Sequence, residues 1–99
     1  MKSDPVTLIE GAAQRIADVA IETPLLRSDA LDEISGAKLL IKAECLQVTG
    51  SFKARGANNA VLQLDDAALG RGVITASGGN HGLALAYAAR ASGARATVY

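Results

Sequence analysis

The sequence contains little that would mark a secreted, membrane-bound or nucleic-acid-binding protein. Ten basic residues balance ten acidic ones, so it lacks the excess of Lys and Arg that proteins use against a phosphate backbone. No apolar run approaches the roughly 18 residues that a bilayer span requires, and residues 1–5 lack the apolar core of a secretory signal. We therefore expect a cytoplasmic protein with no nucleic-acid or membrane partner.

Cysteine and histidine are also scarce, with one of each. The single cysteine, Cys45, cannot form an internal disulfide, which fits a reducing compartment. No second Cys or His stands at ligand spacing from it, so we expect no metal site and take Cys45 to be a small buried residue.

About half of the 99 residues are apolar, and their spacing alternates between helical and extended patterns. The expected elements are, in chain order, a helix over 7–20, a short helix over 31–34 closed by Gly36, a buried strand over 38–42, a loop over 47–51, a helix over 52–64, a connection over 65–71, a strand over 72–76, a tight turn over 77–79, a helix over 80–91 and a strand over 95–99.

The last strand, helix and strand form a βαβ unit, which predicts an α/β fold with a parallel sheet and helices on both faces. The final strand stops at Tyr99 with no turn or polar tail after it. Three expected strands and a few helices also supply less cover than a parallel sheet normally has. We therefore expect this chain to be truncated, as part of a longer protein.

A lysine stands in the opening turn of one predicted helix, in the block Thr49-Gly50-Ser51-Phe52-Lys53-Ala54-Arg55-Gly56-Ala57. The helix dipole disfavours a cation at that end, and a lysine that attacks an aldehyde must present its neutral amine. The position of Lys53 therefore suits Schiff-base chemistry, although a lysine near a loop is more often an ordinary solvated side chain.

A second loop, Ser77-Gly78-Gly79-Asn80-His81-Gly82, lies between a predicted strand and the helix that follows it. Glycines let the backbone approach a ligand closely, and the free N–H groups of the helix start form an anion site for a carboxylate or phosphate. Ser77 and Asn80 add side-chain hydrogen bonds. The alternative is a plain turn with an Asn or Ser cap.

Together the two blocks resemble fold-type II enzymes that depend on pyridoxal phosphate (PLP), most closely the serine/threonine dehydratase (threonine ammonia-lyase) branch. Thr23-Pro24-Leu25, Lys42-Ala43-Glu44 and Gln47 also fall in the order and approximate spacing of that family. The resemblance implies a fold like that of the tryptophan synthase β subunit. It implies that residues 1–70 begin the larger, PLP-binding domain and that residues 71–99 begin the smaller α/β domain.

The resemblance also implies roles for individual residues. Lys53 would hold PLP as a Schiff base and move protons at the substrate Cα, Phe52 would pack against the cofactor ring, and Asn80 would bond the phenolic oxygen of the pyridine. The substrate carboxylate would be held by the loop Ser77, Gly78, Gly79, Asn80 and His81. In that family, the glycines that bind the cofactor phosphate and the residue that contacts the pyridine nitrogen lie further along the sequence, beyond the position of residue 99. We therefore expect residues 1–99 alone to be inactive.

The details of both blocks favour the dehydratase branch. Cysteine and threonine synthases tend to show Lys-Asp-Arg and Asn-Thr-Gly, where this chain has Lys53-Ala54-Arg55 and Asn80-His81-Gly82. Serine racemases need a second acid/base group, supplied by a serine directly before Gly-Asn-His, where this chain has Gly78. That group acts on the cofactor face opposite the lysine. Because Gly78 has no side chain to return a proton there, we expect β-elimination to dominate over racemisation.

The implied reaction converts L-threonine to 2-oxobutanoate and ammonia, or L-serine to pyruvate and ammonia, in an enzyme that is a homo-oligomer at full length. Serine racemase and hydroxyaspartate dehydratase are alternatives on the same fold. A non-catalytic dinucleotide-binding module is an alternative of another class, but the G-x-G-x-x-G fingerprint would need a glycine where Ser77 stands.

Overall fold

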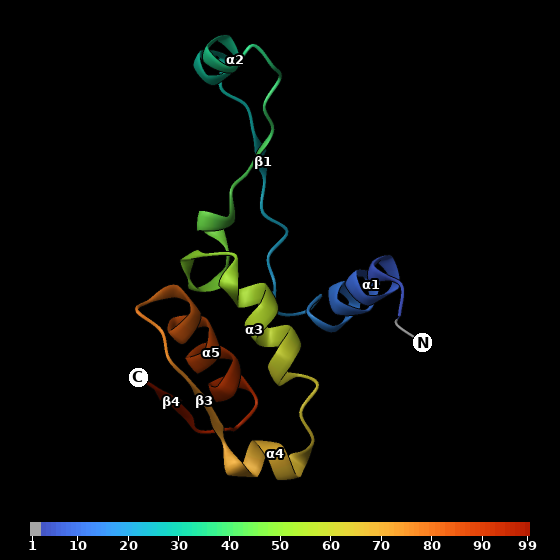
Figure 1. Cartoon of the computed structure of the whole chain (residues 1–99), viewed down its shortest axis with the longest axis vertical. Helices are drawn as coiled ribbons and strands as arrows, with labels where there is room; N and C mark the ends of the chain where they lie inside the picture. The colour runs from blue at the N-terminus through green and yellow to red at the C-terminus, as the bar shows by residue number, and fades with distance from the viewer. Residues whose placement is uncertain (1–2) are drawn as a thin grey trace.

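The computed structural model describes residues 3–99 of the chain. Figure 1 shows that the chain forms helices and short strands joined by loops. The elements are α1 (Pro5–Arg15), β1 (Leu25–Leu26), α2 (Asp29–Ser35), β2 (Ile41–Lys42), the 3-10 turns η1 (Glu44–Leu46) and η2 (Val48–Gly50), α3 (Lys53–Val61), α4 (Asp66–Arg71), β3 (Val73–Thr75), α5 (Asn80–Ala91) and β4 (Ala96–Val98).

The centre of the structure is a βαβ unit with one further helix packed on it. β3 and β4 pair in parallel, with Val73 opposite Ala96 and Thr75 opposite Val98, and α5 connects them and packs against β4. α3 lies beside α5 and runs in the same direction in Figure 1. The expected α/β class and the parallel pairing of the last two strands are therefore confirmed.

The hydrophobic core lies between α3 and α5 and consists mainly of small residues. Alanines at spacings of three and four let the two helices approach closely. The buried members are Ala57, Val61, Ala84, Leu85 and Ala88, with Leu69 and Val73 packed against them. Core residues therefore come from both of the expected domains, residues 1–70 and residues 71–99. The boundary between these two domains stays a prediction.

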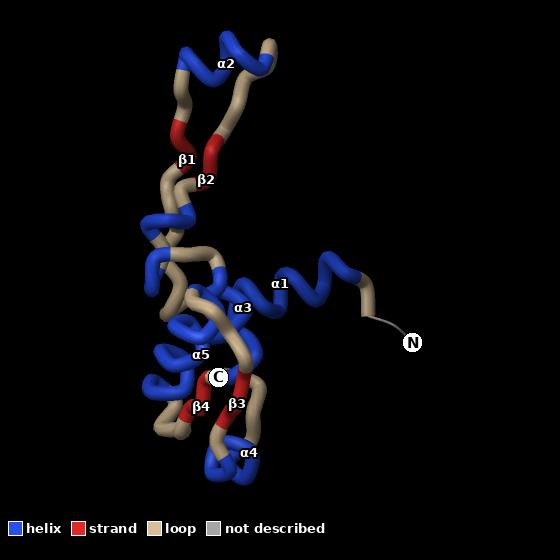
Figure 2. Tube along the Cα trace, turned by 60° about the vertical axis from the view of Figure 1, so that its left-hand side comes forward, coloured by secondary structure: helices blue, strands red, loops and turns tan. Residues whose placement is uncertain are grey.

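The expected buried strand over 38–42 is wrong. Only Ile41 and Lys42 are extended, both are exposed, and they pair antiparallel with Leu25 and Leu26 instead of joining β3 and β4. Together with α2 they form an arm that projects away from the helices in Figure 2. The apolar run indicated burial, but no other element of the described chain covers it, and Leu40 is 64% exposed.

Several element boundaries also differ from the expectation. α1 begins at Pro5, because the Asp4 side chain accepts a hydrogen bond from the Thr7 N–H, and it ends at Arg15 instead of continuing to residue 20. The connection over 65–71 contains the helix α4, which the Asp65 carboxylate caps through the Ala68 N–H. α3 is shorter than expected and ends at Val61.

Three further findings concern the residues that the structure describes. Cys45 is exposed, so the expectation of a buried cysteine is wrong. Within residues 3–99 no helix is both long and apolar enough to span a bilayer, and no group of three or more His, Cys, Asp or Glu side chains could hold a metal ion.

Candidate active site

Lys53 is the first residue of α3, so it lies in the opening turn of the helix as the sequence predicted. Its backbone N–H donates to the Ser51 hydroxyl at 3.4 Å, and its Nζ lies 5.4 Å from the centre of the Phe52 ring. The lysine is half-buried, whereas Phe52 is 61% exposed. An exposed aromatic ring beside a half-buried amine leaves a flat surface on which a planar ligand can pack.

The turn before Lys53 has an uncommon backbone. Thr49 has φ 64° and ψ 7°, a left-handed conformation that a β-branched residue rarely adopts. Strain of this kind costs about 1–3 kcal/mol and persists only where the surroundings enforce it. The buried hydroxyl of Thr49 has no hydrogen-bond partner in the described part of the chain.

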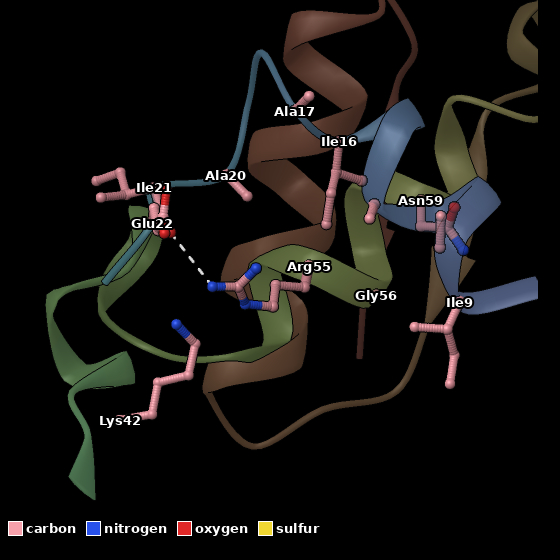
Figure 3. Close-up of a pocket in the computed structure, with 12 residues that line it drawn as sticks. Ile9, Ile16, Ala17, Ala20, Ile21, Glu22, Lys42, Arg55, Gly56 and Asn59 are labelled. Atoms are coloured by element: carbon pink, nitrogen blue, oxygen red, sulfur yellow. Dashed lines mark hydrogen bonds between the residues drawn. The ribbon is translucent and has the colours of Figure 1, made fainter. Parts of the chain in front are cut away.

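A cluster of polar side chains surrounds that turn. The Thr23 hydroxyl and the Arg55 guanidinium both donate hydrogen bonds to the Glu44 carboxylate. Arg55 also donates to the Ile21 carbonyl at 3.2 Å, the contact drawn in Figure 3. Gln47 joins the same group through the backbone of Ile21. The four side chains therefore connect residues 21–23 to the turn before Lys53, residues 48–52, which we call the lysine turn. We call the four residues Thr23, Glu44, Gln47 and Arg55 the clamp.

The clamp has a consequence for stability in acid. The hydrogen bond from Arg55 lowers the pKa of the Glu44 carboxyl to about 2, against a desolvation effect that opposes it. Because this pKa is depressed on folding, the stabilisation is complete above the unfolded pKa near 4.5 and is lost as the pH falls toward 2. Glu44→Gln should therefore be less stable than the unmodified protein at pH 6–7, and the difference should shrink as the pH is lowered from about 4.5.

Denaturant titrations of a full-length protein carrying this sequence, at several pH values, measure that difference. The matched control is Glu33→Gln, since Glu33 is an exposed residue of α2 that makes no side-chain hydrogen bond within residues 3–99. A gap between Glu44→Gln and the unmodified protein that is the same at pH 3 and pH 7 would contradict the ion-pair explanation.

The block Ser77 to Gly82, which we call the glycine loop, joins β3 to α5 and includes the first residues of that helix. The Ser77 hydroxyl accepts hydrogen bonds from the N–H groups of Gly79 at 3.1 Å and Gly82 at 2.9 Å. Both lone pairs of the hydroxyl are thus used by the loop, and its own proton remains available to donate to an anion. No side chain caps α5 at Gly79, so the N–H groups of Asn80 and His81 are also free to bind an anion.

Gly82 holds the start of α5 close to β4. A Cβ atom at Gly82 would lie 2.8 Å from Val98 Cγ1 and 3.3 Å from Ser77 Cβ. Valine has little rotamer freedom to move away, so Gly82→Ala should destabilise the protein by about 1–3 kcal/mol through overpacking. Thermal or denaturant unfolding of the full-length protein measures this loss.

Gly78→Ala provides the control for Gly82→Ala, because a Cβ at Gly78 meets nothing within 4 Å. It should change stability by less than about 0.5 kcal/mol, as expected of a surface substitution. Equal losses in the two variants would show that close packing at Gly82 is not the reason.

The two loops lie at the same end of the helix pair. α3 and α5 both start at the upper end of the pair in Figure 1, so that Lys53 and Asn80 each open a helix there. η2, which contains Thr49, packs against α5. The carboxyl end of β3 leads into the glycine loop on the same side, which is where ligands bind in open α/β sheets.

One cavity, of about 380 Å³, reaches this end. It is lined by residues of α3, α4, β3 and α5, among them Thr75, His81 and Leu85. A larger one of about 530 Å³ lies between α1 and α3 and is shown in Figure 3. The larger cavity contains none of the predicted site residues, although Arg55 of the clamp lines it, so its size alone does not identify the site.

Comparison with known proteins identifies the family of the chain. The family model described as "Pyridoxal-phosphate dependent enzyme" matches residues 16–99, and this chain belongs to that family. The biosynthetic L-threonine dehydratase of Mycobacterium leprae is 47% identical over 92% of the chain and 21% of its own length. The serine racemase of Dictyostelium discoideum is 48% identical over 83% of the chain and 25% of its own length.

Solved structures give the same relationship. Maize serine racemase superposes with a TM-score of 0.89 at 42% identity, over 94% of this chain and 29% of the other. The processed form of threonine deaminase isoform 2 from Solanum lycopersicum superposes with a TM-score of 0.78 at 36% identity, over 99% of this chain and 28% of the other. The recognition of a fold-type II PLP enzyme and of its cofactor is therefore confirmed. The chain spans only about a quarter of the length of its curated relatives.

Proposed function

We propose that the protein to which this chain belongs catalyses β-elimination from a β-hydroxy amino acid. L-Threonine would give 2-oxobutanoate and ammonia, and L-serine would give pyruvate and ammonia. The observation that supports this most is the position of Lys53 and Asn80 at the starts of two adjacent, co-directional helices, in a chain of a PLP-dependent family.

The residues at this end fit the cofactor and an amino acid. The Lys53 amine is half-buried beside the Phe52 ring and would hold the aldehyde carbon of PLP. The exposed face of Phe52 fits a planar pyridine ring. The Asn80 amide would donate to the phenolic oxygen. When bound, PLP supplies an electron sink for the pair left at Cα.

The glycine loop would bind the substrate carboxylate. The free proton of the Ser77 hydroxyl and the backbone N–H groups of Asn80 and His81 are the donors available for it. Gly78 and Gly79 leave the approach open, since a Cβ at either would meet nothing within 4 Å. The Lys53 amine would take the proton from Cα, and the β-hydroxyl would gain a proton and leave as water. The enamine released would then hydrolyse to the 2-oxo acid and ammonia.

Racemisation is the second candidate, because serine racemases are among the similar proteins. It requires a group that returns a proton to the face of Cα opposite Lys53. The position directly before Gly79-Asn80-His81 is Gly78, which carries no side chain. We therefore propose that elimination is the main reaction.

Four further properties belong to the same proposal. The full-length protein is a cytoplasmic homo-oligomer whose substrate is a small amino acid, and residues 1–99 alone show no turnover. Many apolar side chains of this chain are exposed, such as Leu40 at 64% and Ile34 at 83% in the arm. Exposed apolar surface of this kind supports the proposal that other parts of the full-length protein pack against it.

The proposal is tested by incubating full-length protein, loaded with PLP, with L-threonine, L-serine and 3-hydroxyaspartate in separate assays. A 2-oxo acid and ammonia should form in equal amounts from at least one substrate, and D-serine should form more slowly than pyruvate from L-serine. Release of D-serine faster than pyruvate would favour racemisation, and absence of any 2-oxo acid would contradict the proposal.

A further inference from the structure

The clamp of Thr23, Glu44, Gln47 and Arg55 surrounds the lysine turn without including Lys53. Thr23 and Gln47 are each 4% exposed, whereas Glu44 and Arg55 are half-buried, so the cluster is buried on one side. Buried polar groups are stable only when their hydrogen bonds are satisfied, and a satisfied network fixes one geometry. None of the four residues has a role in the chemistry proposed above.

Gln47 uses both ends of its side-chain amide. Its Oε1 accepts from the N–H of Ile21 at 2.8 Å and from the N–H of Val48 at 2.9 Å, and its Nε2 donates to the Ile21 carbonyl at 2.8 Å. The side chain therefore pairs with the backbone of Ile21 as a neighbouring strand would. This fixes the residue from which the lysine turn starts.

Arg55 fixes the other side of the turn. It lies two residues after Lys53 in the first turn of α3, and its guanidinium contacts both oxygens of Glu44 and the carbonyl of Ile21. Residues two apart on a helix do not share a face. Arg55 thus anchors α3 on a side of the helix different from that of the Lys53 amine.

The strained residue Thr49 lies between these two anchors. Its left-handed backbone directs the chain from Gln47 into Ser51, whose hydroxyl bonds the N–H of Lys53. The Gly50 N–H also donates to the Gln47 carbonyl at 2.8 Å. A turn of this kind relaxes when its anchors are removed, and relaxation would move the start of α3 relative to α5.

From this arrangement we propose that Gln47 and the Glu44–Arg55 ion pair are positioning residues that set the place of the Lys53 amine relative to the glycine loop. They would do so without touching cofactor or substrate. This inference rests on the proposed function, since it concerns how Lys53 is presented to the reacting atoms.

The test uses full-length protein loaded with PLP and compares Gln47→Ala, Arg55→Ala and Arg55→Lys with the unmodified protein. Steady-state rates are divided by the amount of bound cofactor, measured by absorbance. Misplacing a catalytic group by about 1 Å can lower the rate by about 100-fold. We expect kcat to fall by about 10- to 100-fold in the two alanine variants, while KM stays within about threefold because the glycine loop is unchanged.

Arg55→Lys keeps the charge opposite Glu44 but loses the planar fork, so it should recover part of the rate. It also remains informative if an alanine variant fails to fold. A second readout is the rate at which borohydride bleaches the cofactor absorbance, which should change severalfold in the same order as kcat. The matched control is Arg15→Ala, which removes the other arginine contact to α3, at Asn59, and should leave both rates unchanged.

The inference is overturned if the clamp variants lose thermal stability but keep the kcat per bound cofactor and the borohydride rate of the unmodified protein. It is also overturned if Arg15→Ala reduces kcat as much as Arg55→Ala. Failure of the proposed function is distinguishable, because the unmodified protein loaded with PLP would then form no 2-oxo acid, before any clamp variant is compared.

Discussion

Replacing Lys53 with alanine is expected to lower the rate of 2-oxo acid formation by about 10³-fold or more in the full-length protein. Positioned acid–base catalysis alone contributes about 10²–10⁴-fold, and the variant also loses the amine that would hold the cofactor. Lys53 opens α3 beside the exposed Phe52 ring, and we propose both roles for it. The measurement is the initial rate with saturating PLP and amino acid.

Lys38→Ala is the control for Lys53→Ala. Lys38 is exposed and lies in the arm between α2 and β2, away from the glycine loop. The control should keep the full rate and the visible absorbance of bound cofactor. A Lys53→Ala protein that retains more than a tenth of the rate would contradict the assignment of the proton transfer to this amine.

Replacing Gly78 with serine is expected to increase racemisation relative to elimination by at least about tenfold, because it adds the second acid/base group that the loop lacks. The substitution should fit, since a Cβ at Gly78 meets nothing within 4 Å and its backbone is not among those with positive φ. The measurement is the ratio of D-serine to pyruvate formed from L-serine.

Gly78→Ala separates the hydroxyl from the effect of adding any side chain at this position. The alanine variant should keep the ratio of the unmodified protein. If Gly78→Ala and Gly78→Ser raise D-serine equally, the loop conformation controls the outcome, and the explanation from a missing proton donor is wrong.

The elements next to the site can be predicted from the sequence because their signals are local. The predicted bounds of α5 are correct, since its alanines and leucines recur at helical spacing and glycines precede and follow it. The predicted start of α3 is within one residue for a similar reason. The prediction misses α4 because six residues are too few to show a helical period, although Asp65 is a capping signal.

The clamp could not be predicted from the sequence, because its contacts join residues that are far apart. Ile21 and Gln47 are 26 residues apart, and Ile21 and Arg55 are 34 apart. Sequence periodicity describes neighbours within a few residues. In the sequence, Thr23, Glu44 and Gln47 are only positions that match the family, whereas the structure shows that they hydrogen-bond to one another.

The strand over 38–42 illustrates the opposite error. A short apolar run indicates burial but does not say what would cover it. In this chain its partner is the exposed pair Leu25–Leu26, and the run forms part of an arm. The prediction for Cys45 fails in the same way, because a residue type that is usually buried elsewhere lies here on an exposed turn.

The most direct test of the central claim is to treat the full-length, PLP-loaded protein with borohydride, digest it and locate the modified peptide by mass. The account predicts one pyridoxyl group, on Lys53. Label on any other lysine, or a protein that stays colourless with added PLP, would contradict it.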